Sequence, residues 1–258
     1  MNPALLKLLD RTAPVLTLLA VLLVWEIGCR AFAVPAFVLP APSVVVASVP
    51  SLELSTWSGH ILATLQVSLI GYLVSILLAV PLAIGITGSR FLARTVLPWL
   101  IVIQSTPIVA IAPIIVVTLG AGTLPRVVIT TLISFFPIVI YTASGLASVP
   151  AELIELSRSL RASRSREYWQ IRLPYAIPHI FSALKVAITL AVIGAVVAEF
   201  VAAEKGLGYL ILFSTSSFKI PVAFAALAIL VCCSLLLYAA IVWLQQRCFP
   251  WSVIKSAD

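Results

Sequence analysis

The chain has 258 residues, of which 62% are hydrophobic and 10% are charged. Soluble domains are roughly half apolar and about a quarter charged, so this composition excludes a soluble globular protein. It predicts an all-α polytopic membrane protein, with a single transmembrane domain over residues 1–258. The formal net charge of +7 does not indicate a nucleic-acid partner. The basic residues lie between apolar runs, beside the membrane lipid, as the positive-inside rule predicts.

The first apolar run, residues 14–32, is the first predicted transmembrane span. Lys7 and Arg11 precede it and a small-x-small triplet follows it, so a cleaved signal peptide is an alternative. Trp25 and Arg30 fit the end of a helix at a membrane interface. We therefore expect a retained span.

Five further apolar runs are long enough for a helix that crosses the bilayer core, which needs about 20 residues. These predicted spans are residues 61–87, 96–119, 127–147, 177–201 and 221–244. A proline-containing segment, residues 42–54, comes before the second span. Pro42 is placed to start a short amphipathic helix there, and we expect this helix to lie on the outer surface.

The distribution of basic residues predicts the orientation of the spans. Of the sixteen Lys and Arg residues, twelve fall on the inner side if the N-terminus is inside, counting Lys185, within a span, as snorkelling toward the inner face. These are Lys7, Arg11, Arg90, Arg94, Arg158, Arg161, Arg164, Arg166, Arg172, Lys185, Arg247 and Lys255. The four on the outer side are Arg30, Arg126, Lys205 and Lys219. Six spans with both termini cytoplasmic follow from this asymmetry.

The polar stretch of residues 148–176 is predicted to form two short cytoplasmic helices. Ser148 and Pro150 are typical of a helix start, and Ser163 is placed to cap the second helix. Leucines recur on one face of the first helix. These are Leu153, Leu156 and Leu160. A loop that only enforces topology needs charges but neither the leucine stripe nor the cap, so we favour a docking surface for a cytosolic partner.

A motif in this loop carries a family resemblance. Glu155-Leu156-Ser157 is followed by Arg161 and then by Ile171-Arg172-Leu173-Pro174. The spacing resembles the signature cytoplasmic loop of membrane subunits of binding-protein-dependent ATP-binding-cassette (ABC) importers. In that family Glu-Ala-Ala is followed by Gly and then by Ile-x-Leu-Pro. Residues 37–43 and the stretch 198–210, which contains Ala198-Glu199-Phe200 and Gly206-Leu207-Gly208, are similar to the nitrate/sulfonate/taurine-type branch.

The resemblance implies a permease subunit of the bacterial inner membrane that forms the substrate pathway with a second permease copy, as a homodimer. Its coupling loop would act on a cytosolic ABC ATPase dimer, which binds ATP and Mg, so no cofactor is expected in this chain. A substrate-binding protein would deliver a sulfonate, taurine, nitrate, or a pyrimidine- or flavin-type precursor. The implied ATPase-coupling residues are Glu155, Leu156, Ser157, Arg158, Leu160, Arg161, Ala162, Ser163, Arg164, Leu173 and Pro174.

Two departures from the motif stand in the coupling loop: Leu156-Ser157 replaces Ala-Ala, and Arg161 replaces Gly. A glycine at the second position suits a left-handed residue that ends the first helix. Arginine in that conformation costs about 1 kcal/mol. Either the turn differs from that of the family, or a contact between the guanidinium and the ATPase offsets the strain.

Four polar residues within spans are candidates for the substrate pathway. They are Gln104, Ser105, Thr106 and Glu199. The first three stand beside Pro107, which interrupts the helical hydrogen-bond ladder, so they could equally satisfy the freed backbone. Glu199 is a candidate because acids at membrane depth are costly, but it could instead pair with Lys205 or meet water at the interface.

The sequence gives no support for catalysis in this chain. The four cysteines, Cys29, Cys232, Cys233 and Cys248, lack metal-ligand spacing and are interpreted as small core residues. Nucleophile–base pairs and phosphate loops are also missing. A secondary transporter working without an ATPase is the main alternative, but it would normally show internal repeats and more buried ionisable residues.

Overall fold

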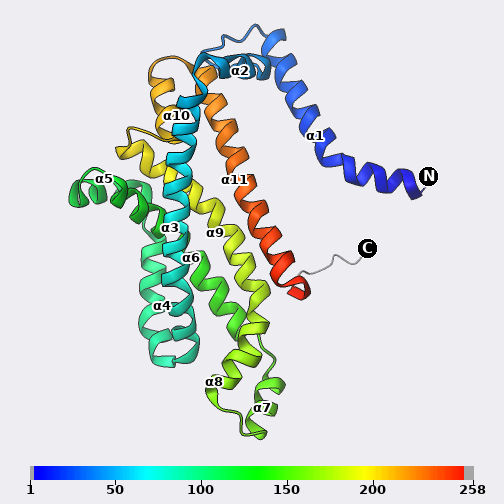
Figure 1. Cartoon of the computed structure of the whole chain (residues 1–258), viewed down its shortest axis with the longest axis vertical. Coiled ribbons are helices and arrows are strands. Elements are labelled where there is room, and N and C mark those ends of the chain that lie inside the picture. Colours follow the sequence, from blue (N-terminus) through cyan, green and yellow to red (C-terminus); the bar gives the residue numbers. More distant parts are fainter. Residues whose placement is uncertain (1–2, 253–258) are drawn as a thin grey trace. The chain divides into compact units, whose positions relative to one another are not determined.

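The structure, a computed structural model, describes residues 3–252, with side chains from Thr12 onward. This part of the chain consists of helices joined by short loops and contains no β-strand (Figure 1). The predicted all-α fold is therefore confirmed. The side chains of Lys7, Arg11 and Lys255, which entered the charge count, lie outside the described residues.

Five helices in the described part of the chain are long and apolar enough to cross a membrane, and a bent pair of helices adds a sixth if it counts as one span. The five are α1 (Pro3–Ala31), α3 (Leu54–Gly88), α6 (Thr123–Ala147), the helix over Arg164–Ala202 and α11 (Ile220–Cys248). The bent pair is α4 (Arg90–Ser105) and α5 (Ile108–Leu119), which meet at 95°.

The chain divides into two compact units, which we describe separately. The first contains Met1–Gly59 and Leu210–Ile229, and the second contains His60–Tyr209 and Leu230–Asp258. The helices α3, α10 (Leu207–Ser216) and α11 therefore contribute residues to both units.

In the first unit, a carboxylate near the end of α1 fastens that helix to α2 (Pro42–Ser48). Glu26 accepts hydrogen bonds from the backbone N–H of Ser43 at 3.0 Å and from its hydroxyl at 2.7 Å. Arg30 donates to the same carboxylate at 2.6 Å. The short 3-10 helix η1 (Val49–Ser51) follows α2, and its Val49 carbonyl accepts from the Trp57 indole at 3.0 Å.

In the second unit, α6 and α9 (Leu173–Ala202) pack along each other closely (Figure 1). The face of α9 toward the core is rich in fully buried alanines, among them Ala183, Ala187, Ala191 and Ala195. At Gly145 the helices approach so closely that an added Cβ would lie 2.6 Å from the Cβ of His179. Small residues permit such close packing of helices in membranes, where van der Waals contact replaces the hydrophobic driving force.

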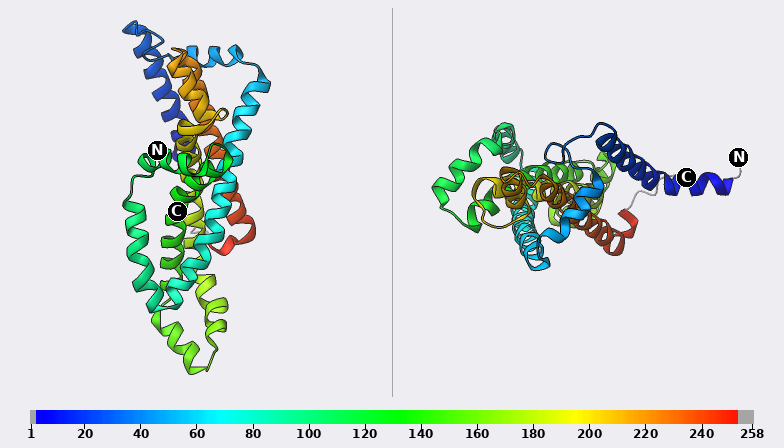
Figure 2. Two further views of the ribbon diagram at one scale, coloured as in Figure 1. Left: turned by 90° about the vertical axis from the view of Figure 1, so that its left-hand side faces the viewer. Right: turned by 90° about the horizontal axis from the view of Figure 1, so that it is seen from above.

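Hydroxyl groups join α3 to α6 in the same unit. Ser75 donates to the carbonyl of Thr131 at 3.0 Å, and its oxygen lies 2.7 Å from that of Ser134. The hydroxyl of Thr131 donates back to Gly71 O at 3.2 Å. Beyond these helices, α7 (Ala151–Ser159) and α8 (Arg164–Glu167) lie where α6 ends and α9 begins, at one end of the unit (Figures 1 and 2).

Candidate functional site

The loop between α6 and α9, residues 148–172, contains the candidate coupling residues. Its first helix, α7, has Pro150 at its N-cap and Glu152 in its first turn, where a negative charge complements the helix dipole. The prediction that Ser148 starts this helix is wrong. Its hydroxyl donates to Gly145 O at 2.8 Å and so satisfies a carbonyl at the end of α6 instead.

The helix α7 ends in a Schellman motif centred on Arg161. The N–H of Ala162 donates to Ser157 O at 3.0 Å, and the N–H of Arg161 donates to Arg158 O at 2.9 Å. Arg161 has φ +54°, which is the left-handed conformation that glycine adopts most easily at this position. The turn therefore keeps the shape expected for the family's glycine, although an arginine occupies it.

The second helix of the loop begins at the predicted cap. The hydroxyl of Ser163 accepts from the N–H of Arg166 at 3.3 Å, so this cap is confirmed. After α8 the chain continues without a break through the π-helical turn η2 (Tyr168–Arg172) into α9. Pro174 falls in the first turn of α9. Because the helix is continuous there, its missing N–H interrupts the helical hydrogen-bond ladder directly after the π-helical turn.

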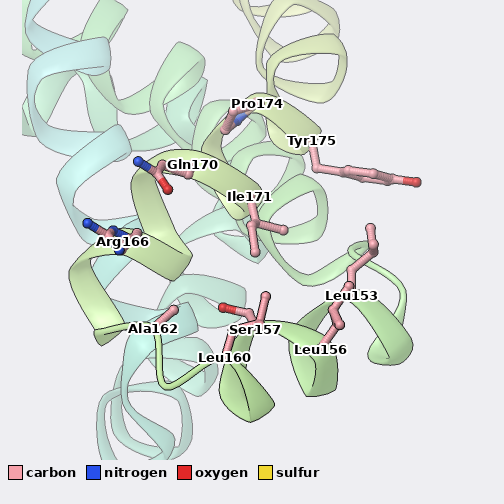
Figure 3. Close-up of a pocket in the computed structure, with 10 residues that line it drawn as sticks. All are labelled: Leu153, Leu156, Ser157, Leu160, Ala162, Arg166, Gln170, Ile171, Pro174 and Tyr175. Carbon is pink, nitrogen blue, oxygen red and sulfur yellow. The ribbon is translucent and has the colours of Figure 1, made fainter.

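A groove of about 510 Å³ lies between α7 and the beginning of α9 (Figure 3). Its walls are mainly apolar, with Leu153, Leu156 and Leu160 on one side and Ile171, Pro174 and Tyr175 on the other. Ser157, Arg166 and Gln170 add polar groups to the lining. The predicted leucine stripe is exposed, and Leu160 reaches 74% exposure. Exposed leucines beside an apolar groove are typical of a surface that binds a partner protein.

The structure brings only some of the predicted coupling residues together. Five line the groove: Leu156, Ser157, Leu160, Ala162 and Pro174. Arg164 and Leu173 instead line a second, smaller cavity of about 260 Å³ beside Tyr168 and Trp169. The side chains of Glu155 and Arg161 are exposed on the loop surface.

Two charged residues of the loop, Glu167 and Arg172, form a contact that the sequence did not indicate, and there they counted only as loop charges. Glu167 is buried and forms an ion pair with Arg172 at 2.7 Å. Arg158, which was predicted to contact the ATPase, also approaches Glu167, at 3.8 Å. Glu167 and Arg172 are five residues apart, whereas ion pairs on an α-helix are three or four residues apart, so the sequence carried no recognisable signal for this pair.

At the other end of α9, Glu199 is buried with 1% exposure and bonded to the segment that follows the helix. Its carboxylate accepts from the hydroxyl of Thr64 at 2.8 Å and from the N–H of Gly208 at 2.7 Å. Thr64 in turn accepts from the N–H of Leu207 at 2.7 Å. These bonds hold the end of α9 and the segment that follows it against α3.

The other pathway candidates stand at the bend between α4 and α5. The hydroxyls of Ser105 and Thr106 donate to the carbonyls of Ile101 and Val102, at 2.8 and 3.0 Å. Both bonds go to the carbonyl four residues earlier, on α4. The carbonyl that Pro107 leaves free in the helical ladder is that of Ile103, and it accepts from the N–H of Thr106 at 3.2 Å. Gln104 is exposed there. Among the described residues, no group of three or more His, Cys, Asp or Glu side chains could hold a metal ion.

Comparison with known proteins agrees with this architecture. Residues 71–250 match the family described as "Binding-protein-dependent transport system inner membrane component". A formylaminopyrimidine transport permease, ThiX, from Halalkalibacterium halodurans is 34% identical over 238 residues, which cover 92% of this chain and 95% of that protein. A riboflavin transport system permease, RibX, from Chloroflexus aurantiacus is 35% identical over 236 residues, covering 91% and 88%.

A solved structure shares the fold. The methionine ABC transporter MetNI in an inward-facing conformation matches with a TM-score of 0.65 at 20% identity, over 81% of this chain and 98% of that chain. The predicted resemblance is therefore confirmed, since the family match extends over more than half of the chain. The chain belongs to the family of binding-protein-dependent transport system inner membrane components, as a multi-pass permease subunit of an ABC importer.

Proposed function

We propose that this permease couples a substrate pathway to ATP hydrolysis through the loop between α6 and α9. The observation that carries the proposal is the exposed leucine stripe of α7 beside the apolar groove. In this proposal α7 and the groove dock on a cytosolic ABC ATPase, which binds ATP and Mg, and Arg158, Arg161 and Arg164 contact its surface. The chain itself is a transport subunit and hydrolyses no ATP.

The charge asymmetry supports an orientation with both termini in the cytoplasm. This orientation places the loop in the cytosol and the segment after α9 on the outer side, where a substrate-binding protein docks. A membrane-impermeant thiol reagent applied to intact cells should label Lys205→Cys but not Glu155→Cys, in a background without native cysteines. Equal labelling of both positions would contradict the orientation.

The proposed assembly contains two copies of this permease and a substrate-binding protein that selects the solute. We favour a nitrogen-heterocyclic solute as the substrate, because two relatives are named for formylaminopyrimidine and riboflavin. Taurine and other sulfonates are the alternative substrate class. Calorimetric titration of the purified binding protein with formylaminopyrimidine, riboflavin and taurine tests the substrate class. Binding of taurine alone would contradict the heterocyclic assignment.

Docking is tested by changing Leu160, the most exposed leucine of the stripe. Leu160→Glu places a charge in the proposed apolar contact, so the ATPase subunit should no longer co-purify with the permease, and hydrolysis of MgATP in the purified sample should fall with it. Leu124→Glu is the matched control, because Leu124 is also exposed but lies on the first turn of α6. Normal co-purification of Leu160→Glu would refute the docking surface.

A further inference from the structure

A bridge of charged side chains connects the helices of the coupling loop, with a buried centre and an exposed end at Arg158, whose side chain is 70% exposed. Its centre is Glu167, the last residue of α8, which is 8% exposed. One carboxylate oxygen accepts a hydrogen bond from Arg172 Nε at 2.8 Å and lies 2.7 Å from a second guanidinium nitrogen. The other oxygen lies 3.8 Å from Arg158 Nε on α7. Glu167 therefore links α7 to the turn from which α9 begins.

Arg172 extends this bridge to α6. Its Nη1 donates to the carbonyl of Leu146 at 3.2 Å, in the last turn of that helix. Carbonyls in a last turn lack partners within the helix, and the helix dipole favours a positive charge there. A guanidinium can bond the carboxylate and the carbonyl together because its five N–H donors are held in a fixed fork. It also lies 5.4 Å from the centre of the Tyr168 ring.

The π-helical turn η2 explains how Glu167 and Arg172 meet. Residues three or four apart share a face of an α-helix, whereas residues five apart do not. A π-helical turn has i→i+5 periodicity in its hydrogen bonds, so it brings residues five apart to the same side. The chain thus adopts a rare backbone form at the point where this ion pair is made.

Stability alone is a poor explanation for such a pair. The cost of desolvating two buried charges offsets most of their attraction, so a buried ion pair adds little net stability, although loss of one partner is costly. What the pair does supply is geometry. The Glu167 carboxylate and the guanidiniums of Arg172 and Arg158 together join α7, the start of α9 and the end of α6.

We propose that Glu167 and Arg172 are positioning residues that transmit movement of α7 to α6 and α9 together. This inference rests on the proposed docking of α7 on the ATPase. When the ATPase shifts α7, the bridge moves the end of α6 and the start of α9 with it. Without the bridge, α7 follows the ATPase and the two transmembrane helices do not.

The test is hydrogen exchange by mass spectrometry on the complete complex of the permease with its ATPase in lipid nanodiscs, using MgATP with vanadate as the added ligand. In the wild type, nucleotide should change exchange in α7 and in residues 140–147 and 173–180. In Glu167→Gln and in Arg172→Lys, the change in α7 should remain and the change in the other two segments should be lost. Lysine keeps the charge of Arg172 but cannot hold the carboxylate and the carbonyl in the same fork.

Glu152→Gln is the control, because it removes an exposed carboxylate from α7, outside the bridge, and should respond as the wild type does. If the pair only stabilises the loop, its substitution should change hydrogen exchange by the same amount with and without nucleotide. If the pair transmits movement, its substitution should change the difference in exchange between the two states. The proposal is overturned if both variants keep the full response at the ends of α6 and α9. It is also overturned if they lose the response of α7, which would assign the pair to docking. A wild-type complex whose α7 does not respond would overturn the docking itself.

Discussion

Arg161 holds the end of α7 in a conformation that a glycine would adopt with less strain. Its φ of +54° is left-handed, and a side chain there costs about 1 kcal/mol relative to glycine. Arg161→Gly should therefore raise the free energy of local opening by about 1 kcal/mol, which slows opening-dependent exchange about fivefold. The amide of Ala162 reports this opening, because it donates to Ser157 O at 3.0 Å within the same turn.

Arg161→Ala separates the effect of the backbone conformation from the effect of the guanidinium. Alanine keeps the Cβ, and with it the strain, but removes the charge. The amide of Ala162 should therefore exchange about fivefold faster in Arg161→Ala than in Arg161→Gly. Equal rates in the two variants would refute the strain. If the guanidinium contacts the ATPase, both variants should bind that subunit more weakly than wild type. Unchanged assembly and unchanged transport-coupled ATP hydrolysis in Arg161→Gly would rule out this contact.

Three further substitutions test the packing of the second unit, each measured by thermal unfolding of the purified permease in detergent. Gly206→Ala should destabilise by about 2 kcal/mol, because Gly206 has φ +135° and an added Cβ would overlap the Glu199 carboxylate. Glu199→Gln should lower the free energy of unfolding by about 1–3 kcal/mol, because the amide NH₂ is a donor and would face a group that needs an acceptor, such as the N–H of Gly208. An unchanged melting temperature with impaired transport would instead support a place for Glu199 in the pathway. Gly145→Val should cost about 1–3 kcal/mol by forcing α6 away from His179 on α9, and wild-type stability would contradict the close packing.

Much of the fold could be predicted from the sequence because membrane helices depend on long apolar runs. Hydropathy located the apolar helices, and the concentration of arginines located the loop between α6 and α9. Motif spacing made a left-handed turn at Arg161 one of two alternatives, since a family glycine at a helix end indicates a backbone requirement. The structure has this turn, with φ +54°. These features are local or periodic, so a single sequence contains them.

The remaining features depend on contacts or backbone forms without a local signature. Thr64 and Glu199 are 135 residues apart, and no sequence pattern indicates that they share a hydrogen bond. The prolines near Thr106 predicted an interrupted helix, but no sequence pattern indicates the angle of 95° at which α4 and α5 meet. Ser148 was assigned to the wrong helix because a serine between two helices can serve either end.

The two buried carboxylates near the ends of the continuous helix over Arg164–Ala202, Glu167 and Glu199, have different physical roles, and their substitutions should therefore have different consequences. Glu199 accepts hydrogen bonds from the hydroxyl of Thr64 and the N–H of Gly208 and so holds a connecting segment in place. Glu167 bonds a guanidinium that itself reaches another helix, so it connects elements that the ATPase would displace. Between them, the alanine-rich face of α9 packs tightly on α6, and alanines lose no rotamer freedom on packing. A close-packed pair of helices resists bending, so a displacement applied at Glu167 moves both helices together rather than deforming either one.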